Sequence, residues 1–160
     1  MKRSKPDLGL KDSSRKAVAG LLATVLADEY VLYTKTRNFH WNVTGGRFHD
    51  LHKFLESQYD EIDDAIDEVA ERIRTLGEMS PGSLAEFLAA ARLKEAAGKA
   101  IPADEMLGAL LADHEALAKS LRKDIDRCGD EFKDAGTQDF LTGLLQQHEK
   151  QAWMLRSFLE

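Results

Sequence analysis

The chain has 160 residues, which is enough for one domain with a substantial hydrophobic core. Its composition is that of an ordinary soluble protein, and its net charge of −6 argues against a surface that binds nucleic acid throughout while suiting a protein that attracts cations. The single cysteine, Cys128, excludes an intrachain disulfide. We expect a cytoplasmic protein without membrane contact, because the longest apolar run, residues 17–27, is too short to cross a bilayer and no secretory signal is visible.

Residues 1–13 are polar and contain several basic side chains, so we predict a flexible basic N-terminal tail there. Ser13 or Ser14 is suited to cap the first long helix, because a serine hydroxyl can accept a hydrogen bond from a free backbone N–H of the first turn. We expect this helix to continue to about residue 43. Residues 14–160 are predicted to form one helical domain.

Apolar residues at helical spacing predict three further long helices after a Gly-Gly turn at residues 45–46. The predicted helices cover residues 47–76, 103–132 and 137–159. The connection over residues 77–102 is long, and its middle, residues 83–91, is typical of a short helix. The predicted fold class is therefore all-α, a four-helix bundle with a short extra helix in the long crossover between the second and third helices.

The second predicted helix combines an apolar ridge with side chains that commonly bind metals. The ridge consists of Phe48, Leu51, Leu55, Tyr59, Ile62, Ile66, Val69 and Ile73. At about 100° per residue these positions fall in one narrow arc, and the next arc holds His52, Glu56, Asp63, Asp67 and Glu71. The acidic residues thus flank the buried stripe instead of standing opposite it, which is unusual for a purely solvated face.

Two pairs of candidate ligands lie on this helix. His52 and Glu56 are four residues apart, as are Asp67 and Glu71, so each pair shares one side of the helix. Eleven residues separate Glu56 from Asp67, which corresponds to about 16 Å of helical rise. Bonds from a metal to such ligands are only about 2.0–2.3 Å long. The two pairs can bind the same ion only if a second, antiparallel copy of the chain brings one pair to the other, which predicts a two-fold dimer with two equivalent sites.

These residues resemble the Dps family, the DNA-binding proteins from starved cells, also called mini-ferritins. The resemblance covers essentially the whole chain and is carried by Leu32-Tyr33, His40-Trp41-Asn42, Gly45, Phe48, Leu51-His52, Tyr59, Asp67 and Ala70-Glu71-Arg72-Ile73. The 12-4-11-4 spacing of His40, His52, Glu56, Asp67 and Glu71 is its most specific part.

The resemblance implies a ferritin-like bundle, a hollow dodecamer and a ferroxidase centre that two subunits share across a two-fold axis. Matched by position, one subunit contributes His40, His52 and Glu56, and the other contributes Asp67 and Glu71. Trp41 matches a tryptophan beside the iron. The implied reaction is oxidation of Fe(II), preferably by hydrogen peroxide, with ferric mineral stored in the cavity and DNA thereby protected from oxidative damage.

The ligand types are consistent with iron, since imidazole and carboxylate groups bind Fe(II), although they also accept zinc and other divalent metals. One departure from the family concerns Glu56, where many relatives have aspartate. Glutamate is one methylene longer and remains an oxygen donor, so we expect a site with altered geometry or affinity. Because these ligand types also accept zinc, a helical zinc-binding module is an alternative interpretation of the same residues.

The remaining histidines are expected to have structural roles. His49 lies outside the metal arc and is predicted at the surface, whereas His114 and His148 lie on the inner stripes of their helices and are predicted in the core or an interface. The chain contains no Glu-x-x-His motif, which argues against a di-iron centre inside a single bundle.

Two further features follow from the resemblance. The acidic residues around the junction of the last two helices are candidates for an iron-entry pore at a three-fold axis: Asp126, Asp130, Asp134 and Asp139. Lys2, Arg3 and Lys5 of the tail are candidates for non-specific, salt-sensitive DNA binding, strengthened by many copies in one assembly. The alternative function is accordingly a DNA-compacting, nucleoid-associated structural protein with a secondary metal site.

Overall fold

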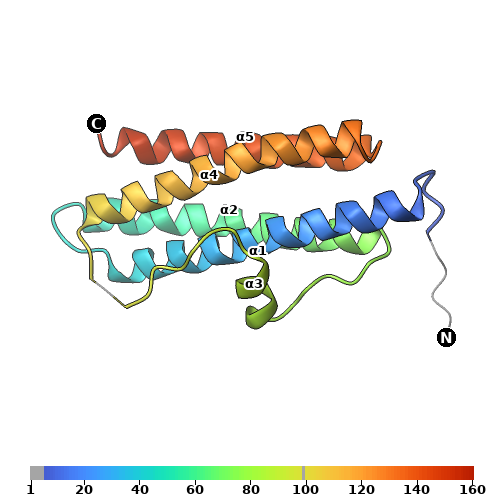
Figure 1. Cartoon of the computed structure of the whole chain (residues 1–160). Coiled ribbons are helices and arrows are strands. Elements are labelled where there is room, and N and C mark those ends of the chain that lie inside the picture. The colour runs from blue at the N-terminus through green and yellow to red at the C-terminus, as the bar shows by residue number, and fades with distance from the viewer. Residues whose placement is uncertain (1–5, 99) are drawn as a thin grey trace.

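The computed structural model describes residues 6–98 and 100–160, and this part of the chain contains five α-helices and no β-strand. The helices are α1 Asp12–Asn42, α2 Phe48–Thr75, α3 Leu84–Ala90, α4 Ala103–Asp130 and α5 Ala135–Ser157. Figure 1 shows α1 beside α2 and α4 beside α5, with α3 packed on the outside of α1. The predicted all-α four-helix bundle with a short extra helix in the crossover is confirmed.

The start of α1 differs from the prediction. Its first residue is Asp12, and the capping position is occupied by Lys11, whose side chain makes no capping hydrogen bond. The prediction that Ser13 or Ser14 caps the helix is therefore wrong. Asp12 instead forms an ion pair of 2.6 Å with Arg15, and its negative charge in the first turn interacts favourably with the helix dipole.

A short turn over residues 43–47 joins α1 to α2 and makes the two helices antiparallel (Figure 1). Gly45 has a φ of +105°, a backbone conformation that favours glycine because no side chain clashes there. Its carbonyl accepts a hydrogen bond of 3.0 Å from the backbone N–H of Phe48, the first residue of α2. The turn thus places the last turn of α1 beside the first turns of α2.

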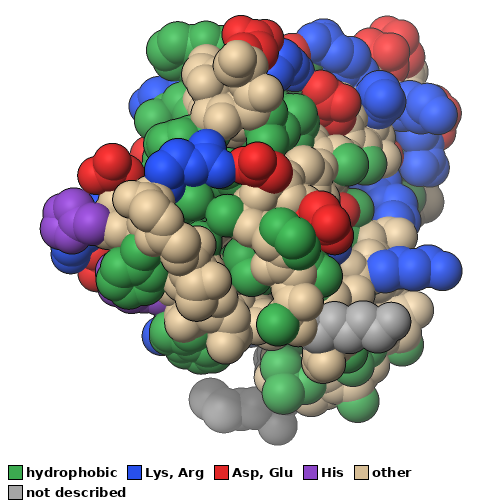
Figure 2. Space-filling model, turned by 90° about the vertical axis from the view of Figure 1, so that its left-hand side faces the viewer, with side chains coloured by type: hydrophobic (Ala, Val, Ile, Leu, Met, Phe, Trp, Pro, Cys, Tyr) green, Lys and Arg blue, Asp and Glu red, His purple; other side chains and the backbone are tan. Residues whose placement is uncertain are grey.

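The end of the bundle that contains this turn faces the viewer in Figure 2, where positive and negative side chains are interspersed with hydrophobic ones. Arg47 of the turn forms an ion pair with Asp104 in the first turn of α4 and also donates a hydrogen bond of 3.2 Å to the Phe158 carbonyl. Exposed ion pairs of this kind contribute at most about 1 kcal/mol. Their effect here is to connect the starts of α2 and α4 with the C-terminal end of α5.

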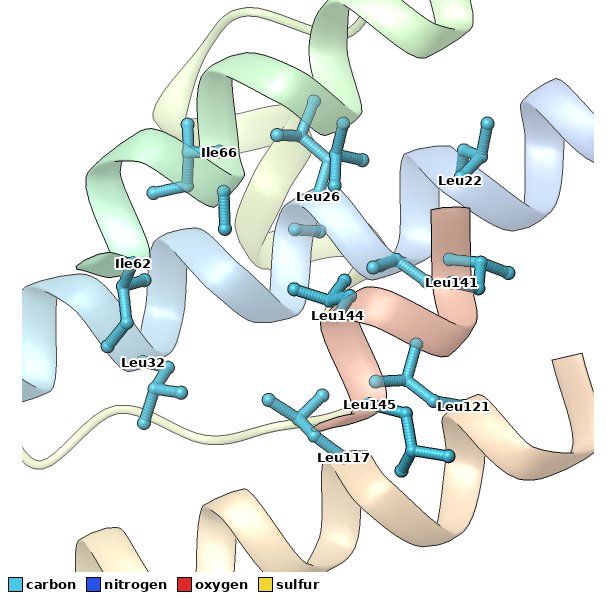
Figure 3. Packing of buried hydrophobic residues seen from close by; sticks show 14 of the residues in the cluster. Leu22, Leu26, Leu32, Ile62, Ile66, Leu117, Leu121, Leu141, Leu144 and Leu145 are labelled. Carbon is cyan, nitrogen blue, oxygen red and sulfur yellow. The ribbon is translucent and has the colours of Figure 1, made fainter. Parts of the chain in front are cut away.

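Leucine and isoleucine side chains from all four long helices meet in the middle of the bundle. Figure 3 shows Leu22, Leu26 and Leu32 of α1, Ile62 and Ile66 of α2, Leu117 and Leu121 of α4, and Leu141, Leu144 and Leu145 of α5. Each of these side chains is buried. Burial of one such side chain contributes about 1.5–3 kcal/mol, so this shared core is the main source of the stability of the bundle.

α1 is the most central helix. Its most apolar 18-residue window has a mean hydropathy of 1.3, which by length and composition would allow it to cross a membrane, but 61% of that window is buried inside the bundle. The apolar side chains of α1 therefore form part of the protein core, where α1 packs against α2, α3 and α4.

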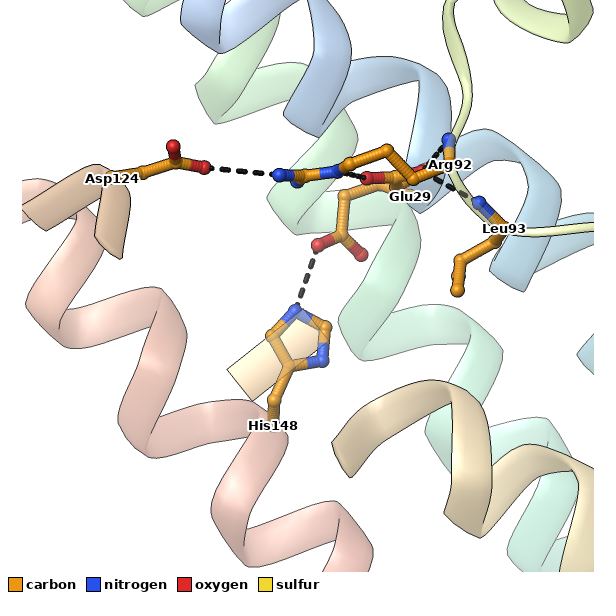
Figure 4. A network of polar contacts seen from close by, with 6 residues as sticks. Glu29, Arg92, Leu93, Asp124 and His148 are labelled. Carbon is orange, nitrogen blue, oxygen red and sulfur yellow. Dashed lines mark hydrogen bonds and ion pairs between the residues drawn. The ribbon is translucent and has the colours of Figure 1, made fainter. Parts of the chain in front are cut away.

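The crossover is fixed to α1 by a buried carboxylate. Asp28 is fully buried and accepts hydrogen bonds from the backbone N–H groups of Arg92 and Leu93, at 2.6 and 3.0 Å. The Arg92 side chain donates to Asp28 at 2.7 Å and to Asp124 of α4 at 3.3 Å (Figure 4). A buried charge is tolerated only when it is paired and hydrogen-bonded, and here one carboxylate meets that condition by ordering the chain between α3 and α4.

A second buried network crosses the bundle directly beside the first. His148 of α5 forms a hydrogen bond of 2.7 Å between its Nε2 and Glu29 of α1 (Figure 4). Its Nδ1 lies 2.9 Å from Nδ1 of His114 in α4. All three side chains are buried, which confirms the prediction that the two histidines occupy the core. Burial lowers the pKa of His114 well below its ordinary value, and the neighbouring His148 lowers it further, so His114 is neutral in the folded protein.

This network predicts a loss of stability in mild acid. Below about pH 6.5 the unfolded chain protonates His114 while the folded chain does not, so the free energy of unfolding should fall as the pH falls, by up to about 1.4 kcal/mol per pH unit from this group. A His114→Asn variant keeps a polar side chain but no titrating group, and it should show a shallower slope. The measurement is urea unfolding between about pH 7.5 and about pH 5 at a fixed subunit concentration.

The matched control is His49→Asn, which removes an exposed histidine and should leave the slope unchanged. Parallel pH curves for the parent and the His114→Asn variant would contradict the assignment.

Candidate metal site

His40 and His52 form the centre of the candidate site. His40 lies in the last turn of α1 and is 6% exposed, and His52 lies early in α2 and is half-buried. The two rings stack with their centroids 3.8 Å apart and an interplanar angle of 19°. Nδ1 of His40 lies 2.8 Å from the carbonyl oxygen of His52, and Nδ1 of His52 lies 2.9 Å from the carbonyl oxygen of His40.

This reciprocal pairing determines which nitrogen of each ring can bind a metal. A backbone carbonyl oxygen only accepts hydrogen bonds, so each Nδ1 must donate and carry the proton. The Nε2 atom of each neutral ring then holds a lone pair, and it has no hydrogen-bond partner in the described part of the chain. Two adjacent imidazoles with fixed tautomers are therefore ready to bind a cation through Nε2.

Glu56 lies one helical turn after His52 and is partly exposed. Its carboxylate forms an ion pair of 2.7 Å with Lys53. The hydrogen bond from Lys53 lowers the pKa of Glu56, the charge of Lys53 lowers it further, and positive charge on His40 or His52 acts in the same direction. Glu56 is thus a carboxylate one helical turn from His52, and an incoming cation has only a flexible lysine to displace.

Asp67 and Glu71 are exposed on a more distant part of α2. Asp67 lines a hollow of about 410 Å³ together with Asp63 and Asp64 of α2 and apolar residues of α1 and α3. Within residues 6–98 and 100–160 of a single chain, no three His, Cys, Asp or Glu side chains are arranged to hold one metal ion. One chain therefore brings the rings of His40 and His52 together but does not by itself gather His40, His52, Glu56, Asp67 and Glu71 into one metal site.

Aromatic side chains surround the histidine pair. Phe48 stacks on His52 at 5.1 Å between centroids, and Tyr59 meets His40 edge to face at 5.2 Å. Trp41 follows His40 directly and is 64% exposed, so its ring is accessible beside the site.

Arg37 connects this aromatic shell, and sequence reasoning missed it. Its guanidinium lies 5.5 Å from the Tyr33 ring, 5.1 Å from the Trp41 ring and 4.9 Å from the Tyr59 ring. It also donates a hydrogen bond of 2.6 Å to the Tyr33 hydroxyl. The spacing of Tyr33, Arg37 and Trp41, four residues apart on one helix, was a readable signal. The participation of Tyr59 was not, because it depends on how α2 packs against α1.

The four candidate pore residues do not share one environment. Asp126, Asp130 and Asp139 are exposed near the junction of α4 and α5. Asp134 is only 3% exposed and caps α5, because its carboxylate accepts hydrogen bonds from the Thr137 backbone N–H at 3.0 Å and hydroxyl at 2.7 Å. It also pairs with Arg72 of α2 at 3.2 Å.

Asp134 is thus the buried capping residue of α5, a role that we did not predict. The cause is the start of α5 at Ala135 instead of Thr137, which makes Asp134 the residue whose side chain caps the helix. The exposed acids of this region are thus Asp126, Asp130 and Asp139.

The basic residues Lys2, Arg3 and Lys5 lie outside the described residues. The segment that follows them contacts the far end of α2: Pro6 packs so closely on Gly77 that a Cβ on this glycine would lie 2.6 Å from the proline ring. Leu10 is partly buried against the core. The chain is therefore attached to the bundle from Pro6 onward.

The hydrogen bonds of the histidine pair predict an unusual tautomer for both rings. In the metal-free protein at about pH 8, His40 and His52 should carry their proton on Nδ1, whereas the exposed His49 should show the Nε2–H form that free imidazole side chains favour. The measurement is ¹⁵N magnetic resonance of protein labelled at histidine, with His40→Gln and His52→Gln variants for assignment. Nε2–H signals from either ring would disprove the proposed ligand orientation.

Comparisons with known proteins identify relatives of the chain. The family model of the ferritin-like domain matches residues 19–160. An uncharacterized low temperature-induced protein of Nostoc sp. is 49% identical over 154 residues, covering 96% of this chain and 86% of the relative. The DNA protection during starvation protein of Brevibacillus brevis is 39% identical over 151 residues, covering 94% of this chain and all of the relative.

The fold is also found among solved structures. The crystal structure of a Dps protein from Vibrio cholerae, described as a member of a broad superfamily of ferritin-like diiron-carboxylate proteins, superposes with a TM-score of 0.91 at 30% identity and full coverage of both chains. The superposition extends over the whole of both chains, so the bundle is ferritin-like, as predicted. The chain belongs to the Dps family of ferritin-like proteins.

Proposed function

We propose that this protein is a ferroxidase that oxidises Fe(II), preferably with hydrogen peroxide, and stores the ferric product. The observation that carries the proposal is the stacked His40–His52 pair, whose reciprocal hydrogen bonds leave both Nε2 lone pairs available, with the Glu56 carboxylate one helical turn after His52. Two neutral imidazoles and a carboxylate bind Fe(II) well, and added carboxylates favour the Fe(III) product because a harder, more highly charged ion prefers oxygen ligands.

The proposed site is completed by a second subunit. Glu56 and Asp67 belong to one continuous helix, and their separation of about 16 Å is far greater than any metal–ligand bond. A two-fold axis with antiparallel α2 helices places Asp67 and Glu71 of the partner opposite His40, His52 and Glu56, and it creates two such sites in each dimer. The hollow beside Asp67 provides an acidic surface against which the α1–α2 turn region of the second subunit, which carries the histidine pair, can pack.

The residues then have distinct roles in the reaction. His40 and His52 bind and orient the incoming Fe(II). Glu56 releases Lys53 and partly neutralises the charge of the metal ion. Asp67 and Glu71 stabilise the Fe(III) product and release it toward the growing mineral. Two Fe(II) ions supply two electrons, peroxide accepts them with two protons, its O–O bond breaks, and two water molecules and two Fe(III) ions result. Trp41 lies at the open edge of the site.

The wider role follows from the same chemistry. Consuming Fe(II) and peroxide together prevents the formation of hydroxyl radicals, which agrees with the name of the Brevibacillus brevis relative, a DNA protection during starvation protein. We propose a hollow dodecamer, located in the cytoplasm, as the store for the ferric mineral. The exposed acids Asp126, Asp130 and Asp139 are the proposed lining of the iron-entry pore. Zinc suits the same ligands and is expected to compete with iron.

Complementation between two inactive variants tests the shared site. His52→Ala and Asp67→Ala proteins should each lose most of the peroxide-driven Fe(II) oxidation, because every site in them lacks one ligand. When the two chains are co-expressed with different tags and the mixed assemblies are purified, each mixed dimer has one intact site and one that lacks both ligands. Random mixing should therefore restore about a quarter of the parental rate. The rate is measured by stopped-flow absorbance after anaerobic loading with Fe(II).

A His49→Ala variant is the matched control, since His49 is an exposed histidine of the same helix that lies outside the site, and it should oxidise iron at the parental rate. Full activity in both single variants would refute the ferroxidase assignment. Inactive single variants that fail to complement would refute the sharing between subunits.

A further inference from the structure

Arg37 carries a permanent positive charge that has no carboxylate partner within residues 6–98 and 100–160 of its own chain. Its guanidinium donates one hydrogen bond, of 2.6 Å, to the Tyr33 hydroxyl, and its Nε is buried without a partner in the same part of the chain. A guanidinium has five N–H donors and favours paired hydrogen bonds to a carboxylate. Arg37 therefore has the capacity to bind an acidic group that its own chain does not supply.

Asp63 is an exposed carboxylate that likewise has no hydrogen-bond or ion-pair partner among the described residues. It lies one helical turn after Tyr59 and lines the acidic hollow beside Asp67. The hydrogen bond to Tyr33 raises the pKa of Arg37, and the charge of Asp63 acts in the same direction, so Asp63 lies on the side of α2 that is near Arg37. One face of the chain thus presents two opposite charges that do not pair with each other.

The antiparallel dimer of the proposed function determines which levels of the two α2 helices face each other. Because Glu56 of one chain meets Asp67 of the other, the two-fold axis passes midway between them, beside residues 61 and 62. In this register Asp63 of each chain lies at the level of Asp60 in the partner subunit. The axis therefore brings Asp63 to the middle of the other chain's α2 helix.

Symmetry also determines which sides of these helices meet. A two-fold axis perpendicular to the plane of two antiparallel helices places equivalent sides next to each other, so the side of α2 that borders α1 lies beside its own copy. Tyr59 and Asp63 are four residues apart and share that side, and the Arg37 guanidinium lies 4.9 Å from the Tyr59 ring centroid. The dimer thus brings the carboxylate of one chain to the guanidinium of the other.

We propose that Arg37 of each subunit forms an ion pair with Asp63 of the partner subunit, which gives two symmetric pairs across the dimer axis. The inference rests on the dimer of the proposed function. Each α2 presents a row of acids to the other helix: Asp60, Asp63, Asp64 and Asp67. Acids that face acids oppose association, whereas two arginine–carboxylate pairs favour it and select one register. Arg37 is therefore the residue that allows the acidic helices to assemble.

Exchanging the two charges tests this pairing. In Arg37→Asp an acid faces an acid at both contacts, and in Asp63→Arg an arginine faces an arginine, so each variant should dimerise at least about tenfold more weakly than the parent. An equimolar mixture of the two variants should recover the parental affinity, because both contacts of a mixed dimer again join one acid to one arginine. The measurement is sedimentation velocity of the iron-free protein over a series of concentrations, with native mass spectrometry to identify the mixed dimers.

Asp64→Arg is the matched control, since it makes the same change of charge at the next residue, about 100° around the helix. It should not restore assembly when it is mixed with Arg37→Asp. The double variant Arg37→Asp/Asp63→Arg should associate like the parent, which checks that the fold tolerates both changes.

The proposal is overturned if the mixed single variants stay dissociated, or if either single variant associates like the parent. A double variant that assembles while the mixture stays dissociated would place the pair inside one chain. Assembly is measured without iron, so a parent that assembles but fails to oxidise Fe(II) would refute the proposed function and leave the charge-exchange result unaffected.

Discussion

The reciprocal hydrogen bonds of His40 and His52 join the last turn of α1 to the second turn of α2. They require the two helices to be antiparallel neighbours with a fixed register, which the tight turn at Gly45 provides. Because each Nδ1 is used in this contact, the same two bonds that hold the helices together also leave both Nε2 atoms available for a cation. The same hydrogen bonds therefore determine both the packing of the two helices and the tautomer of each ring. Replacement of either histidine would change the packing and orientation of the other.

The stiffness of α2 determines how these ligands are used. Carboxylates and imidazoles are distributed along 28 residues of one helix, and a helix cannot bend enough to bring Asp67 to Glu56. A single chain consequently carries two groups of proposed ligands that lie far apart along α2. In the proposed assembly, the metal site forms only when the dimer forms. This makes iron chemistry dependent on assembly and prevents an unassembled subunit from binding iron tightly and reacting in the open.

Sequence periodicity predicted the number and extent of the helices well, because an apolar face repeats along each of them. It also grouped His52 with Glu56, and it indicated the buried places of His114 and His148. It did not predict partners that are far apart in the chain, such as Glu29 for His148 or Tyr59 for Arg37. Helical spacing specifies which face a side chain occupies, whereas its partner depends on the register between two helices. The burial of Asp134 was missed for a local reason, the earlier start of α5.

The buried polar pairs of α1 have a role beyond their small net contribution to the free energy of folding. Burying charge is costly, and apolar residues in place of such pairs often leave a protein equally stable. Yet Asp28, Glu29 and Lys35 bind three different segments: the crossover, α5 and, through a 2.5 Å ion pair with Asp113, α4. A shift of α1 by one residue would rotate it by about 100° and leave all three charges buried without partners. A purely apolar α1 would tolerate such a shift far more easily. These pairs thus fix the rotation of α1, and with it the position of His40 against His52 at its far end.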